Sequence, residues 1–106
     1  MITCYLRYQV PLGKVAEFET YAAMWLELLP RFGGTHHGYF LPSEGDSDVA
    51  LAMFSFPSLA AYEQYRKDAE SDPDVQKAIA FVKETRCFTR YERSFFRPLF
   101  PKTAAA

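Results

Sequence analysis

Residues 49–56 read Val-Ala-Leu-Ala-Met-Phe-Ser-Phe, and this stretch decides the fold. Its residue types favour a strand, in which successive side chains point to opposite faces of a sheet. One face then carries Val49, Leu51 and Met53, and the other carries Ala50, Ala52, Phe54 and Phe56. A sheet with helices on one side and water on the other should alternate apolar and polar residues, and this strand does not. The stretch therefore predicts a sheet that is covered on both faces.

Periodicity places the other elements on either side of this strand. Alternating side chains predict strands, and apolar residues at steps of three and four predict helices. The predicted strands are residues 2–10, 35–42, 49–56 and 87–96, and the predicted helices are residues 14–29, 59–70 and a short one that begins at Pro73. Residues 43–48 contain no apolar side chain and predict the turn between the second and third strands.

This order of elements is β-α-β-β-α(α)-β, which is the ferredoxin-like βαββαβ pattern of an α+β domain. Right-handed crossovers give an antiparallel sheet in the order 4-1-3-2 with its helices on one face. The other face would expose a large apolar patch, so we expect a homodimer that pairs through this sheet face. We expect residues 1–98 to form the domain and residues 99–106 to form a C-terminal tail.

Composition limits the partners and the compartment. The chain has 106 residues, a net charge of −1 and no massed basic residues, so we expect neither nucleic acid nor a membrane as a partner. The N-terminus does not resemble a signal peptide. Two widely spaced cysteines, Cys4 and Cys87, form neither a disulfide framework nor a zinc motif. We therefore expect a cytoplasmic protein with free thiols and no cofactor.

Three blocks of sequence resemble the NIPSNAP family. They are Phe-Gly-Gly-Thr-His-His-Gly-Tyr-Phe at 32–40, Phe-Ser-Phe-Pro-Ser-Leu-Ala-Ala-Tyr at 54–62, and Arg-Tyr-Glu-Arg-Ser-Phe-Phe-Arg-Pro at 90–98. The resemblance covers residues 1 to about 98 and implies the dimeric α+β barrel superfamily. That superfamily includes cofactor-free monooxygenases, haem-handling enzymes, isomerase-like proteins and binding modules. It supplies no catalytic signature that can be transferred to this chain, so the resemblance leaves the activity open.

In this fold a pocket can open between the helices and the sheet, and large inward-facing side chains with polar tips would line it. The candidate lining residues are Trp25, His37, Tyr39, Tyr62, Tyr65, Arg66, Tyr91 and Arg93. Strict alternation puts His37 on the face of Tyr39 and His36 on the other face, so the two histidines cannot hold one metal ion. Two interpretations compete with a role in ligand binding. The histidines can have a structural role, and the aromatic residues can simply be part of the core.

Arg66 is unexpected on an otherwise apolar helix stripe, because a cation there needs a carboxylate or a ligand anion. Glu92 is one possible partner, and the sequence does not decide between the two. The sequence thus predicts a NIPSNAP-like protein that binds a small molecule, with no assigned activity. The alternatives are a cofactor-independent monooxygenase-like or isomerase-like enzyme and, less favoured, a haem protein that uses one histidine.

Overall fold

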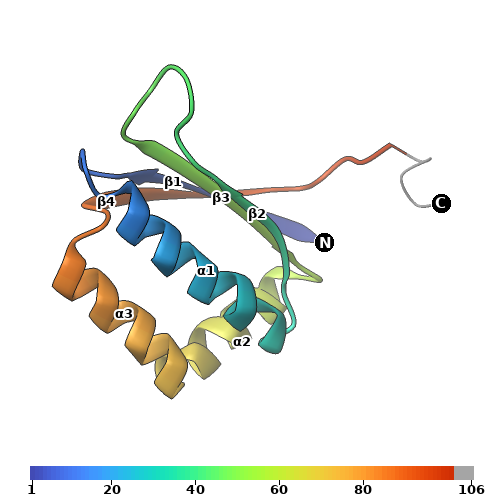
Figure 1. The fold of residues 1–106 in the computed structure, drawn as a ribbon. Coiled ribbons are helices and arrows are strands. Elements are labelled where there is room, and N and C mark those ends of the chain that lie inside the picture. The colour runs from blue at the N-terminus through green and yellow to red at the C-terminus, as the bar shows by residue number, and fades with distance from the viewer. Residues whose placement is uncertain (102–106) are drawn as a thin grey trace.

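The computed structural model describes residues 1–101 of the chain (Figure 1). Its elements, in chain order, are β1 (Ile2–Gln9), α1 (Val15–Arg31), β2 (Thr35–Phe40), β3 (Val49–Phe56), α2 (Leu59–Glu70), α3 (Pro73–Thr85) and β4 (Arg90–Phe96). No helix within residues 1–101 has the length and apolar character that crossing a membrane requires. Of the predicted tail, residues 102–106 lie outside the described residues.

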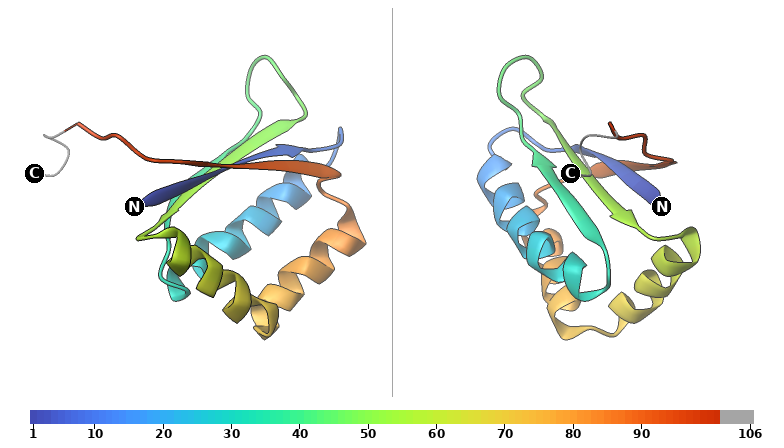
Figure 2. Two further views of the ribbon diagram at one scale, coloured as in Figure 1. Left: turned by 180° about the vertical axis from the view of Figure 1, so that it is seen from behind. Right: turned by 90° about the vertical axis from the view of Figure 1, so that its right-hand side faces the viewer.

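The four strands form one antiparallel sheet in the order β2-β3-β1-β4, which confirms the predicted 4-1-3-2 topology. Helices α1, α2 and α3 lie on the same side of the sheet, and within residues 1–101 the opposite face carries no helix (Figures 1 and 2). We call this opposite face the bare face. It carries the odd-numbered residues of β1 and β3, because Cys4 pairs with Phe54 and Leu6 pairs with Ala52 on the helix side.

The ends of several elements differ from the sequence expectation, and β1 ends at Gln9 rather than at residue 10. β4 begins at Arg90 rather than at residue 87, because Cys87 and Phe88 still belong to the connection from α3. β2 ends at Phe40, before Pro42. α1 continues through Pro30 to Arg31, because a proline in the last turn leaves few helical hydrogen bonds to break. Phe32 and Gly33 then donate to the carbonyls of Leu29 and Pro30 and end the helix.

The core lies between the helices and the inner face of the sheet. Alternate residues of β1 and β3 supply one wall, and one stripe of α1 supplies the other. The largest of the fully buried side chains, each exposed by less than 2%, are Phe18, Leu29, Val10, Cys4 and Cys87. α1 lies against β2 and α3, and α3 lies farther from the sheet than α1 does (Figure 1). This separation leaves room for a cavity.

β2 contains one irregularity, which decides where its histidines point. His36 pairs with Phe54 and Gly38 pairs with Met53, so His37 is an extra residue without a partner in β3. This is a β-bulge. Gly38 has φ of 113°, a backbone conformation that glycine adopts without the steric penalty of a side chain.

Candidate functional site

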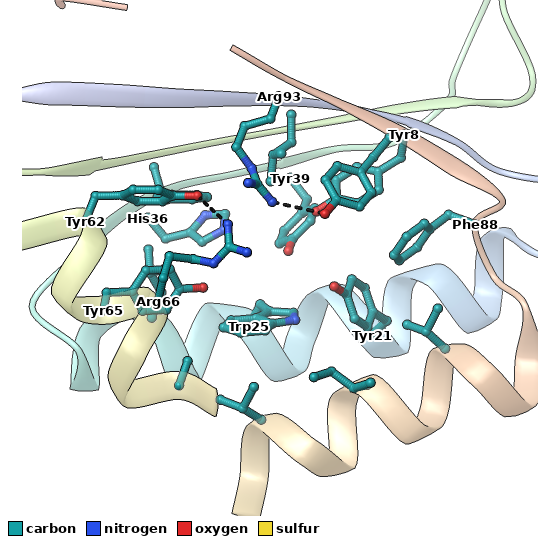
Figure 3. A pocket seen from close by; sticks show the side chains of 18 of the residues that line it. Tyr8, Tyr21, Trp25, His36, Tyr39, Tyr62, Tyr65, Arg66, Phe88 and Arg93 are labelled. Carbon is teal, nitrogen blue, oxygen red and sulfur yellow. Dashed lines mark hydrogen bonds between the residues drawn. The ribbon is translucent and has the colours of Figure 1, made fainter. Parts of the chain in front are cut away.

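A cavity of about 450 Å³ lies between the inner face of the sheet and the helices (Figure 3). β1, β2, β3 and β4 form its roof, while α1, α2 and α3 form its floor and sides. Most of its wall is aromatic or aliphatic. The aromatic lining residues are Tyr8, Tyr21, Trp25, Tyr39, Phe54, Tyr62, Tyr65, Phe88 and Tyr91. The ionisable nitrogen and carboxylate groups of the lining belong to His36, Arg66, Glu70, Lys83 and Arg93.

Seven of the eight residues proposed from the sequence line this cavity. They are Trp25, Tyr39, Tyr62, Tyr65, Arg66, Tyr91 and Arg93. They come from four elements, α1, β2, α2 and β4, and the close-up view shows those that it labels turned toward one another (Figure 3). The eighth residue, His37, does not line it.

His36 takes the place in the cavity that alternation assigned to His37. The bulge inserts one residue between His36 and Gly38, so His36 and Tyr39 face the helices together. Their rings stack with centroids 4.9 Å apart. The Nε2 atom of His37 lies 2.7 Å from Ser55 Oγ on the bare face, where Ser55 also contacts Thr3 Oγ1 at 2.7 Å. The expectation that His37 lies in the pocket is therefore wrong, although the two histidines do point to opposite faces.

His36 is neutral and has a defined tautomer. The backbone N–H of Gly38 donates a hydrogen bond to His36 Nδ1 at 2.9 Å, so the single hydrogen of the neutral ring is on Nε2. Burial, followed by the charge of His37, lowers the pKa of His36 to about 4. At neutral pH, His36 therefore presents an N–H donor to the cavity and is not placed to act as a general base.

The tyrosines of the cavity stay protonated at neutral pH. Burial is the largest cause in each case, and it raises the pKa of Tyr8, Tyr21, Tyr39 and Tyr65 well above the ordinary value of a phenol. Phenolate chemistry is thus disfavoured here. The hydroxyl groups can still donate or accept hydrogen bonds to a bound molecule.

The indole of Trp25 presents a further donor. Its Nε1 atom is buried and has no hydrogen-bond partner among the described residues. This N–H group offsets part of the rise that burial causes in the pKa of Tyr21. The Tyr21 hydroxyl and the indole N–H are nevertheless not in hydrogen-bonding geometry. A buried donor without a partner is uncommon in folded proteins, and a ligand acceptor would satisfy it.

Arg66 and Arg93 enter the cavity from two different elements, α2 and β4 (Figure 3). Arg66 Nη1 donates to the Tyr62 hydroxyl at 3.0 Å, and Arg93 Nη2 donates to the Tyr91 hydroxyl at 3.0 Å. Neither forms an ion pair within residues 1–101. Glu92, which the sequence offered as a partner of Arg66, instead pairs with Arg90 on the bare face.

Several lining residues were not among the sequence candidates. Tyr21 lies one helical turn before Trp25, and Tyr8 shares the inner face of β1, so both could have been found from periodicity. His36 could have been found from Gly38, because a glycine inside a strand is a signal for a bulge. Phe88 carries no such signal, since it precedes β4 and reaches the cavity only through the connection from α3.

Comparison with solved structures identifies the fold of this chain. A cofactor-independent oxygenase, SnoaB from Streptomyces nogalater, superposes with a TM-score of 0.67 at 17% identity, over 95% of each chain. The chain thus shares the α+β fold of that oxygenase. A NIPSNAP family protein of unknown function from Agrobacterium tumefaciens superposes with a TM-score of 0.79 at 17% identity, over 92% of this chain and 87% of that one.

An uncharacterised NIPSNAP domain protein from Burkholderia xenovorans superposes with a TM-score of 0.74 at 19% identity, over 93% of this chain and 95% of that one. The sequence model of the NIPSNAP family matches residues 5–100. The chain belongs to the NIPSNAP family, as its three sequence blocks predicted. No protein with a curated description matches it significantly.

Proposed function

We propose that this NIPSNAP family protein binds a small, flat, largely apolar molecule in the cavity between its helices and its sheet. The observation that carries the proposal is the cavity itself: about 450 Å³ of space with an aromatic wall and a few convergent polar groups. Ligand sites in proteins commonly have volumes of about 300–1,000 Å³ and this kind of lining. The polar groups at Trp25, His36 and the two arginines would fix the orientation of the bound molecule.

The single tryptophan of the chain provides the test, because Trp25 lies in the cavity wall. Its indole N–H gives one resonance in a ¹H–¹⁵N spectrum. We expect that resonance to shift when aromatic molecules of one to three rings are added. Ile79→Phe, which enlarges a half-exposed side chain of the lining, should weaken the binding. The control Leu59→Phe lies on α2, outside the cavity, and should not. A panel that leaves the Trp25 resonance unmoved would contradict the proposal.

A cofactor-independent oxygenase is the second candidate function, favoured by the aromatic cavity in a fold shared with such an enzyme. In that case the bound molecule would supply the electrons. Dioxygen would give one oxygen atom to the product and one to water. Oxygen uptake in the presence of electron-rich phenols and quinols tests this idea, and Ile79→Phe should suppress any uptake. If compounds bind and no oxygen is consumed, the oxygenase function is wrong and the binding function stands.

Haem is a poor fit to these residues. His37 Nε2 is hydrogen-bonded to Ser55 Oγ on the bare face, outside the cavity. His36 could ligate iron only through a lone pair on Nε2, yet its tautomer, set by the Gly38 N–H, has the hydrogen on that atom. Haem titration without a Soret band is therefore expected.

The same proposal includes a homodimer that pairs through the bare face. On that face Phe40, Met53 and Phe96 are 53%, 36% and 54% exposed, and no helix covers them (Figure 2). A second copy of this chain is the simplest partner for the bare face, because a two-fold contact needs only one self-complementary surface. The face also carries charges of both signs, Arg90 and Glu92, which a two-fold contact can pair. A cytoplasmic location completes the proposal and agrees with the two free thiols.

Sedimentation at micromolar concentration tests the dimer. We expect about twice the chain mass of 12.2 kDa. Met53→Lys should lower the mass toward that of one chain, because it places a charge in the middle of the contact. Leu26→Lys replaces a side chain on α1 that is 43% exposed, and it should leave the mass unchanged. A wild-type protein that sediments as one chain would contradict this part.

A further inference from the structure

We propose that the ligand of the cavity is an aromatic carboxylate, with its carboxylate group held by Arg66 and Arg93 and its ring system between the aromatic walls. This inference rests on the proposed function and specifies the chemical class of the ligand. Three observations carry it: two guanidinium groups that have no carboxylate partner within residues 1–101, an excess of hydrogen-bond donors, and the size and shape of the apolar space.

The two guanidinium groups face one region of space. Both act on the buried groups of Cys4 and Tyr65, where their charges oppose the larger effect of burial on the pKa. Both line the cavity, and the close-up view shows Arg93 reaching into it from the sheet and Arg66 from α2 (Figure 3). Each donates one side-chain hydrogen bond, to a tyrosine of its own element, and keeps further N–H groups unused.

Like charges that converge without an anion repel one another, so a bound anion would stabilise this arrangement. The charged groups of the lining are Arg66, Lys83 and Arg93 on the positive side and Glu70 on the negative side. Glu70 forms no ion pair with either arginine in the part of the chain that the structure describes. The cavity thus has a positive balance, although the net charge of the whole chain is −1.

The uncharged polar groups point to the same conclusion. Trp25 Nε1–H is buried and meets no acceptor in the described part of the chain, and the hydrogen of neutral His36 is on Nε2. Together with the arginines, these groups offer N–H donors to a space whose acceptors are mainly tyrosine oxygens. A carboxylate brings acceptors only, and its planar geometry suits a guanidinium group. A ligand rich in donors would leave these N–H groups unsatisfied.

The apolar part of the cavity wall indicates the size and shape of the rest of the ligand. Trp25 meets the ring of Tyr65 edge-on, with centroids 6.3 Å apart, and Tyr62 stacks on Phe54 at 6.3 Å. The space of about 450 Å³ is roughly three times that of an engineered apolar cavity of about 150 Å³ that binds benzene. An acid with two or three rings would fill it and stack against these side chains.

The experiment compares naphthalene-2-carboxylate with naphthalene-2-carboxamide, which has the same shape and no charge. Calorimetry measures the affinity, and the Trp25 indole resonance places the compound in the cavity. We expect the acid to bind at least tenfold more tightly than the amide. Arg66→Gln and Arg93→Gln should each weaken the binding of the acid about tenfold and leave the binding of the amide unchanged, since only the acid forms charge-assisted hydrogen bonds with both partners ionised. Amide binding by these variants shows that they fold.

Lys67→Gln is the matched control, because Lys67 follows Arg66 on α2 and does not line the cavity. It removes the same charge and should change neither affinity. If the amide binds as tightly as the acid, or if both arginine variants bind the acid like the wild type, the carboxylate inference is wrong while the binding function stands. If neither compound binds the wild-type protein, the proposed function fails and the inference fails with it.

Discussion

The backbone N–H of Gly38 donates to the Nδ1 atom of His36, two residues before it, across a distance of 2.9 Å. This hydrogen bond lies in the β-bulge of β2, where Gly38 adopts φ of 113°. It sets the tautomer of His36, and the bulge turns His36 rather than His37 toward the cavity. One glycine thus decides both which histidine faces the ligand space and which of its nitrogens carries the hydrogen.

The first prediction concerns the titration of His36. Its pKa in the folded protein is about 4, below the ordinary value of 6.5, so the unfolded chain binds more protons between these two pH values. The stability contributed by neutral His36 is therefore complete above pH 6.5 and is lost as the pH falls toward 4. We expect an NMR midpoint near pH 4 for the His36 ring. His36→Asn, which keeps an acceptor for Gly38, should flatten the fall in stability between pH 6.5 and 4. A midpoint near 6.5 would contradict the burial of this ring.

The second prediction concerns Gly38 itself. Gly38→Ala places a side chain at positive φ and should destabilise the protein by about 1–3 kcal/mol. Because the bulge would relax, the NMR titration of His36 should also move toward 6.5. Gly45→Ala is the matched control, since Gly45 has φ of 96° with open space around it in the turn between β2 and β3. It should lower stability and leave the His36 titration in place. An unchanged titration in Gly38→Ala would show that the bulge does not depend on glycine.

The third prediction concerns a close approach at the start of β2. A Cβ atom at Gly34 would lie 2.8 Å from Phe56 Cζ and 2.9 Å from Leu29 Cδ2. Gly34→Ala should therefore destabilise the protein by about 1–3 kcal/mol through overpacking, measured by urea unfolding. Combining it with Phe56→Leu should recover part of that loss, because the smaller side chain relieves the contact. Additive effects of the two changes would contradict this packing explanation.

The fourth prediction separates two roles of Asp72. Its Oδ1 atom accepts from the backbone N–H groups of Asp74 and Val75 and caps α3, while Oδ2 lies 2.9 Å from Arg31 Nη2. Asp72→Ala removes both contacts and should cost about 1 kcal/mol of stability. Asp72→Asn keeps the cap and loses the charge. It should stay close to the wild type in thermal unfolding, because the Arg31 side chain of this pair is half exposed to water, which weakens an ion pair. Equal losses in both variants would assign the effect to the ion pair.

The sequence by itself determined the order of the elements, the sheet topology and the family, because these follow from periodicities that each segment carries locally. Seven of the eight proposed site residues line the cavity for the same reason. The exception shows the limit of local reasoning. Strict alternation chose His37, and a single extra residue in β2 reversed that choice, since a shift of one position moves a side chain to the other face of a sheet.

Only the tertiary structure decided that a cavity exists and that Arg66 has no carboxylate partner among residues 1–101. α3 stands away from the sheet, which leaves space beside Trp25, and Glu92 points to the bare face with Arg90. Sequence patterns specify which face a residue occupies, but they do not specify the gap between packed layers or the partner that a long side chain reaches. Both depend on side chains from distant segments that meet only in the folded chain.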